Sequence, residues 1–107
     1  MPLYHGGRGR RAPGAFVAPG RKPNPWGDTF DEHGRSIYVY ATESINTATG
    51  YRDAIRSLGR WASVYEVEAT GETIDAGMEI KSRHPMTIIR RLTDQEVNDL
   101  IDEEKRS

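Results

Sequence analysis

The sequence has no cysteine among its 107 residues. This absence excludes a disulfide scaffold, a zinc site with thiolate ligands and a cysteine nucleophile. No apolar stretch approaches the roughly 18 residues that a membrane-spanning helix needs. The first residues also lack the charged-then-apolar layout of a signal peptide. We therefore expect a soluble, cytoplasmic protein with no membrane partner.

Excess charge of one sign is also lacking, because the net charge is -1 although charged residues make up 29% of the chain. Proteins that bind nucleic acids or membrane surfaces through general electrostatic attraction are usually strongly basic, so the overall charge argues against that class. The three histidines, His5, His33 and His84, are far apart and lack metal-ligand spacing, so no metal site is predicted. The length predicts one domain over residues 1–107.

One segment, residues 6–36, is rich in glycine, proline and arginine. It predicts a long irregular loop with a brief strand at residues 15–17. Its basic residues make it locally positive: Arg8, Arg10, Arg11, Arg21, Lys22 and Arg35. Such a run is more often a solvated loop than a phosphate clamp, although it leaves nucleic-acid binding open.

Hydrophobic periodicity predicts an α+β fold. The expected strands lie at residues 1–5, 36–41, 61–68 and 79–92, the last as a strand pair or one bent strand, and the helices at residues 44–58 and 93–105. Thr93 and Glu96 have the spacing of a capping box at the start of the second helix. Trp26 and Trp61 are expected to be packing residues.

Four stretches in sequence order, LYHGG, IYVYAT, VYEVEATGE and KSRHPMTIIRRL, resemble the rifampin ADP-ribosyltransferase family, small bacterial enzymes that inactivate a rifamycin antibiotic. The matching residues are Tyr4-His5-Gly6, Ile37-Tyr38-Val39, Val64 to Gly71, and Ser82 to Met86. The resemblance implies an ADP-ribosyltransferase-like fold, with two small, packed, mostly antiparallel sheets that form an NAD cleft. One internal helix and one C-terminal helix would accompany the sheets.

The resemblance also implies a catalytic site of the His-Tyr-Glu type, with NAD as co-substrate. It places His5 and Tyr38 at the first two positions. The third is left open between Asp75, in the loop after Thr70-Gly71, and Glu79, at the start of the last core strand. The residues implied in NAD binding are His5, Gly6, Gly7, Arg8, Tyr38 and Ser82.

The chemistry of NAD cleavage suits these residue types. The nicotinamide–ribose bond breaks through an oxocarbenium-like state, which a nearby carboxylate stabilises. That is the role expected of Glu79, with Asp75 orienting the acceptor. An imidazole such as His5 can hydrogen-bond a ribose hydroxyl, and the face of Tyr38 can stack on nicotinamide.

Two further contacts with NAD are expected beside the histidine. Glycines at positions 6 and 7 let the main chain approach the nicotinamide carboxamide. Arg8, Arg10 or Arg11 would then meet the pyrophosphate.

Three functions stay open at this stage. The first is a mono-ADP-ribosyltransferase that releases nicotinamide and moves ADP-ribose from NAD to a small molecule, a protein or a nucleic acid. The second is an RNA 2′-phosphotransferase-like enzyme that uses the arginine-rich loop on a 2′-phosphate. The third is an inactive module that binds NAD, nucleic acid or a protein partner.

Overall fold

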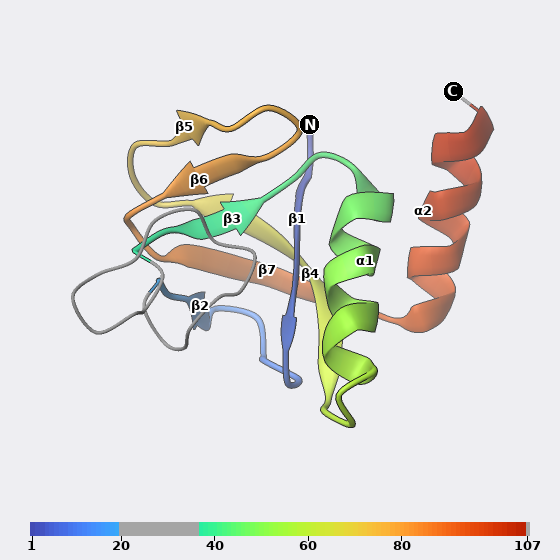
Figure 1. Cartoon of the computed structure of the whole chain (residues 1–107). Coiled ribbons are helices and arrows are strands. Elements are labelled where there is room, and N and C mark those ends of the chain that lie inside the picture. The colour runs from blue at the N-terminus through green and yellow to red at the C-terminus, as the bar shows by residue number, and fades with distance from the viewer. Residues whose placement is uncertain (20–36, 107) are drawn as a thin grey trace.

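The computed structural model describes residues 1–19 and 37–106. The described residues form seven strands and two helices, arranged in three layers (Figure 1). The predictions for Trp26 and His33, and for the predicted loop over residues 20–36, concern residues outside the described part. The outcome is a small α+β fold, as the periodicity predicts.

The larger sheet has four strands in the order β1-β4-β7-β2, all antiparallel. Their bounds are β1 (Leu3–Arg8), β4 (Ala62–Ala69), β7 (Met86–Leu92) and β2 (Phe16–Val17). The smaller sheet has the order β3-β6-β5, with β3 (Val39–Ala41), β6 (Ile80–Ser82) and β5 (Ile74–Asp75). One bridge, between Tyr4 and Thr42, joins β1 to the end of β3.

Strand β4 is central in the larger sheet because it lies between β1 and β7, and side chains on both of its faces are buried. Val64 packs with the helices, while Tyr65 and Val67 pack with the smaller sheet. A register shift between Glu66 and Val67 inserts one extra residue into β7. Because of this bulge, β7 contributes to the hydrophobic core on each face of the sheet. Ile88 packs on the side of the smaller sheet, and Leu92 packs on the side of the helices.

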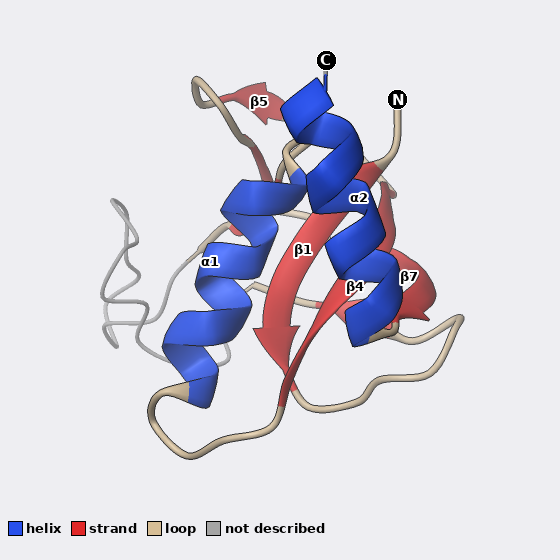
Figure 2. Ribbon diagram, turned by 90° about the vertical axis from the view of Figure 1, so that its right-hand side faces the viewer, coloured by secondary structure: helices blue, strands red, loops and turns tan. Residues whose placement is uncertain are grey.

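Both helices cover the face of the larger sheet that lies away from the smaller sheet (Figures 1 and 2). Helix α1 (Ile45–Arg56) starts at Ser44, whose side chain accepts a hydrogen bond from the Thr47 N–H. Helix α2 (Asp94–Arg106) starts with the predicted capping box: the Glu96 carboxylate accepts from the Thr93 N–H, and the Thr93 hydroxyl accepts from the Glu96 N–H. No helix among the described residues is long and apolar enough to cross a membrane.

Three sequence predictions need correction. Strand β1 continues to Arg8 instead of ending at residue 5, because its glycines pair in register with β4. Residues 79–92 form two strands that do not pair with each other, so Glu79 precedes β6 of the smaller sheet and is not on the last core strand. Trp61 is 70% exposed and is not a core residue.

Candidate functional site

Strand β1 has one main-chain edge that pairs with β4 and an opposite edge that meets the end of β3. Tyr4 exchanges both main-chain hydrogen bonds with Thr42, at 2.7 and 2.9 Å. Main-chain groups alternate sides along a strand with a period of two, so the N–H and C=O of Gly6 point to the same edge as those of Tyr4. Among the described residues, only Tyr4 pairs at that edge. Gly6 therefore has one donor and one acceptor without a main-chain partner among residues 1–19 and 37–106.

The two glycines of β1 are required by different neighbours. A Cβ on Gly6 would lie 2.0 Å from the Ala48 carbonyl oxygen and 3.0 Å from the Tyr51 Cβ, so only glycine lets α1 approach the strand. A Cβ on Gly7 would lie 2.6 Å from the His5 Nε2, because the imidazole lies over this residue. Room for α1 and for the His5 ring is thus a structural reason for these glycines, and the predicted room for a flat ligand stays a prediction.

His5 is held in one orientation and one tautomer. Its Nδ1 lies 2.7 Å from the Tyr40 carbonyl oxygen, which can only accept, so Nδ1 carries the proton. Burial lowers the pKa of His5, and the positive charge of Arg11 lowers it further, while the Tyr40 carbonyl acts in the opposite direction. The imidazole is therefore neutral at pH 7, and its Nε2 is a hydrogen-bond acceptor.

A carboxylate, that of Glu79, lies immediately before β6 and beside Tyr51. The Tyr51 hydroxyl of α1 hydrogen-bonds Glu79. Burial, this hydrogen bond and the Glu79 charge raise the pKa of Tyr51 to about 12. The Oε1 atom of Glu79 is buried and has no hydrogen-bond partner among the described residues. We name His5, Tyr40, Tyr51 and Glu79, with the edge of Gly6, the His5–Glu79 cluster.

The hairpin that carries Glu79 is fixed to the rest of the cluster. The Thr42 hydroxyl donates to the Met78 carbonyl at 2.9 Å, next to the point where β3 pairs with β1. The Ala76 N–H donates to the Glu79 carbonyl at 2.8 Å and closes the turn. These bonds hold the Glu79 backbone against β3, so the carboxylate has a defined position.

Tyr38 lies beside this cluster, on the same side of the chain as Tyr40. The two ring centroids are 6.5 Å apart in an edge-to-face arrangement. The Lys81 ammonium lies 4.5 Å from the centroid of the Tyr38 ring, and the Arg83 guanidinium lies 5.8 Å from it. The tyrosine is thus a half-buried aromatic surface with two cations beside it, and its role toward nicotinamide stays a prediction.

Asp75 and Ser82 make structural contacts outside the cluster. Asp75 is exposed on β5, which β6 separates from β3, and its carboxylate accepts from the Gly77 N–H at 3.0 Å. Ser82 is buried; its hydroxyl donates to the Glu72 carbonyl and accepts from the His84 N–H. Of the two candidate carboxylates, the structure brings Glu79 into the cluster and leaves Asp75 in a turn.

Two of the three arginines predicted to meet a pyrophosphate have other contacts. Arg11 donates from its side chain to the Phe16 carbonyl and from its main chain to the Tyr65 hydroxyl. Arg10 lies over the Trp61 ring. Arg8 is half-buried at the end of β1, and its role stays a prediction.

Tyr51 lies within the predicted helix over residues 44–58, and sequence analysis did not identify it as a site residue. Its register three residues after Ala48 places it against β1, at the point where glycine permits close approach. A polar aromatic residue on the buried side of a helix was the available signal.

No protein-family profile and no curated protein matches this chain.

Proposed function

We propose that this protein is a mono-ADP-ribosyltransferase that cleaves NAD and transfers ADP-ribose to an acceptor through the His5–Glu79 cluster. The proposal rests on the resemblance of four sequence stretches to such enzymes and on the polar groups that the fold gathers there. Two antiparallel sheets with a helix after β3 are compatible with an ADP-ribosyltransferase-like fold. The acceptor is a nucleophile that is still to be identified.

The observation that supports the proposal most strongly is the unpartnered oxygen of Glu79. A buried acceptor without a donor costs about 1–3 kcal/mol, and more when it is charged, so proteins retain such groups mainly where they have a use. A ribose 2′-hydroxyl would supply the missing hydrogen bond to Oε1. The same carboxylate would stabilise the positive charge that develops on the ribose as the glycosidic bond breaks.

The other groups of the cluster have complementary roles in the proposal. The neutral His5 accepts a hydrogen bond from a ribose hydroxyl at Nε2, since Nδ1 is committed to Tyr40. The N–H and C=O of Gly6 pair with the C=O and NH₂ of the nicotinamide carboxamide. Tyr51 holds the Glu79 carboxylate in place and is a positioning residue.

The proposed reaction is a substitution at the ribose carbon, with no net oxidation or reduction. The bonding pair of the nicotinamide–ribose bond leaves with nicotinamide, whose ring nitrogen loses its positive charge. The acceptor donates a pair to the ribose carbon and loses its proton to solvent or to a nearby base. The proposal therefore needs NAD and a nucleophile, with no metal required for charge balance.

The test is release of nicotinamide from NAD by the purified protein, with and without cell lysate, using NAD labelled in its ADP-ribose part. We expect release that lysate accelerates and label on one class of acceptor. Glu79→Gln is expected to lower kcat about 100- to 1,000-fold. Asp75→Asn is the matched control, because it removes one carboxylate from the same hairpin while an amide oxygen can still accept from Gly77.

Two results would contradict the proposal. One is absence of both NAD binding and nicotinamide release, which would favour the inactive binding module. The other is equal activity in Glu79→Gln and the wild type, with a large loss in Asp75→Asn. Release that needs a 2′-phosphorylated RNA would favour the phosphotransferase alternative.

A further inference from the structure

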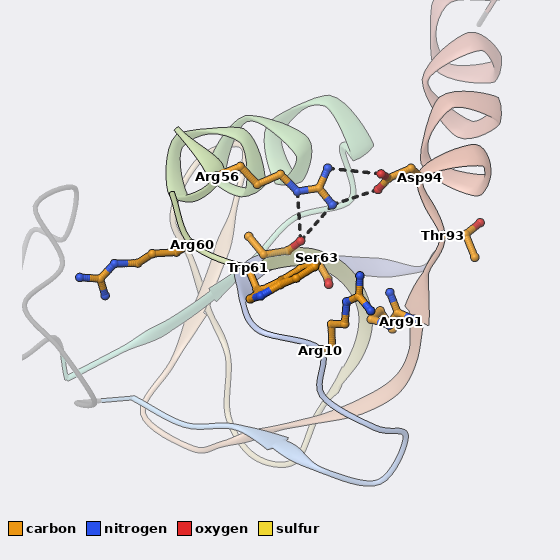
Figure 3. Close-up of a pocket in the computed structure, with 9 residues that line it drawn as sticks. Arg10, Arg56, Arg60, Trp61, Ser63, Arg91, Thr93 and Asp94 are labelled. Atoms are coloured by element: carbon orange, nitrogen blue, oxygen red, sulfur yellow. Dashed lines mark hydrogen bonds and ion pairs between the residues drawn. The ribbon is translucent and has the colours of Figure 1, made fainter. Parts of the chain in front are cut away.

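A second polar surface lies where α1 ends, β4 begins and β7 meets α2. It is a groove of about 490 Å³ lined by residues from four separate parts of the chain. Figure 3 shows its side chains. The lining residues, which we call the arginine groove, are Arg10, Arg56, Arg60, Trp61, Ala62, Ser63, Arg91, Thr93 and Asp94.

The charge of the groove is strongly positive, although the chain as a whole is nearly neutral. Its one carboxylate, Asp94, is paired with Arg56 at 3.0 Å, and Arg56 also donates to the Ala62 carbonyl. The remaining cations are Arg10, Arg60 and Arg91, all exposed. None of the three forms an ion pair with a carboxylate in the described part of the chain.

An exposed aromatic ring lies between these cations. Trp61 is 70% exposed, and the Arg10 guanidinium lies 4.2 Å from the centroid of its ring. In the view of Figure 3, Arg60 extends to one side of the tryptophan, and Arg10 and Arg91 lie on the other. Separated cations with an aromatic platform between them match phosphates spaced along a strand, with a base stacked on the ring. A single phosphate would instead need cations that converge on one point.

We propose that the arginine groove binds single-stranded nucleic acid, with Arg10, Arg60 and Arg91 on phosphates and a base on Trp61. The binding needs no sequence recognition, because every base has a face that stacks on an indole. The groove is lined by other residues than the His5–Glu79 cluster, so this proposal does not depend on NAD cleavage. It assigns a function to a tryptophan that sequence analysis placed in the core.

The test is fluorescence anisotropy of a labelled oligothymidylate of about ten nucleotides, titrated with the full chain. Binding is measured between roughly 50 and 200 mM salt. Each phosphate contact on a single strand contributes about -0.7 to the slope of log K against log salt, so three arginines predict a slope near -2. Arg10→Gln, Arg60→Gln and Arg91→Gln should each reduce the magnitude of this slope by about 0.7.

Trp61→Ala should weaken binding by about 5- to 150-fold without removing the salt dependence, because it deletes the stacking surface and no charge. Arg106→Gln is the matched control, since it removes one exposed arginine at the far end of α2. Thermal melting of every variant checks that the fold is kept. Four results would overturn the proposal: no binding, an equal loss in Arg106→Gln, equal binding of duplex DNA with no effect of Trp61→Ala, or equally tight binding of free thymidylate.

Discussion

The His5–Glu79 cluster and the arginine groove both border α1, yet they use polar groups in opposite ways. In the cluster, the residues are half-buried and two of the groups have a named partner: the Tyr40 carbonyl fixes the imidazole, and Tyr51 holds the carboxylate. In the groove, three arginines are exposed and Trp61 presents its ring to solvent. The first arrangement suits bond breaking at one defined point, and the second suits binding of a variable ligand.

This difference has measurable consequences for substitution and for salt. Groups in a half-buried cluster interact at close range and are less screened than exposed charges, so removing one partner has a large effect that ionic strength changes little. Interactions of exposed charges are screened by salt, so each charge contributes little to the free energy of binding or folding. Substitutions in one region at a time therefore distinguish the two. Effects in the His5–Glu79 cluster should be large and insensitive to salt, and effects of single charges in the arginine groove should be small and salt-dependent.

The largest effect on the free energy of unfolding is expected for Gly6→Ala, which disrupts the contact between β1 and α1. The new Cβ would lie 2.0 Å from a main-chain oxygen of α1, and a helix backbone cannot move aside as a side chain can. We expect a loss of about 3 kcal/mol in the free energy of unfolding, at the upper end of overpacking effects. Urea unfolding monitored by circular dichroism measures it.

Gly50→Ala is the matched control for this change. Gly50 lies within α1 with no heavy atom near the place of a Cβ, so alanine there should stabilise the protein by about 0.5–1 kcal/mol. A Gly6→Ala variant as stable as the wild type would show that β1 and α1 are farther apart than described here. Tyr51 would then not lie close to β1, and the His5–Glu79 cluster would not be held against α1.

A smaller effect is expected from pH, through His5. Because burial holds the pKa of His5 below its ordinary 6.5, the unfolded chain takes up a proton that the folded chain excludes as the pH falls through 6.5. The contribution to stability is complete above that value and is lost as the pH decreases toward the folded-state pKa. Nicotinamide release should fall in the same acidic range, as Nε2 stops being an acceptor.

Urea unfolding at about pH 7.5 and about pH 5 tests this dependence. The His5→Gln variant should lose less stability between the two values than the wild type. His84→Gln is the control, because this histidine is exposed and belongs to neither region. Identical pH dependence in His5→Gln and the wild type would contradict a buried, neutral imidazole.

The sequence predicts local elements well because their signals are local. The capping box at Thr93, the amphipathic helix after Ser44 and the alternation around Tyr65 each depend on neighbours within a few residues. Strand β1 was predicted too short because its glycines have low strand propensity. The pairing of Arg8 with Ala62 outweighs that propensity, and a single sequence does not reveal such a long-range partner.

The candidate site was predictable only in part, for the same reason. His5 and Glu79 stand out by residue type, but the choice between Glu79 and Asp75 depends on which side of a hairpin approaches β3. Tyr51 and the arginine groove depend on contacts between distant segments. Trp61 was expected to be a packing residue within the predicted strand over residues 61–68, yet β4 begins only at Ala62 and Trp61 is exposed.

The smallest expected effects come from two carboxylates of α2 that contact opposite ends of α1. Glu104 accepts hydrogen bonds from the Ser44 hydroxyl, the Asn46 N–H and the Asn46 side chain at the start of α1. Asp94 pairs with Arg56 at its end, and this hydrogen bond lowers the pKa of Asp94. Glu104→Gln and Asp94→Asn should each lower the free energy of unfolding by about 1 kcal/mol or less.

Binding of the labelled oligothymidylate should tell the two variants apart. Asp94 is the only carboxylate among the residues that line the arginine groove, so Asp94→Asn makes it more positive and should tighten binding by about 2- to 5-fold at low salt. Glu104→Gln removes the same charge at the far end of the helix and should leave binding unchanged. Equal tightening in both variants would mean that net charge controls the affinity, since only a local field distinguishes the groove from the rest of the surface.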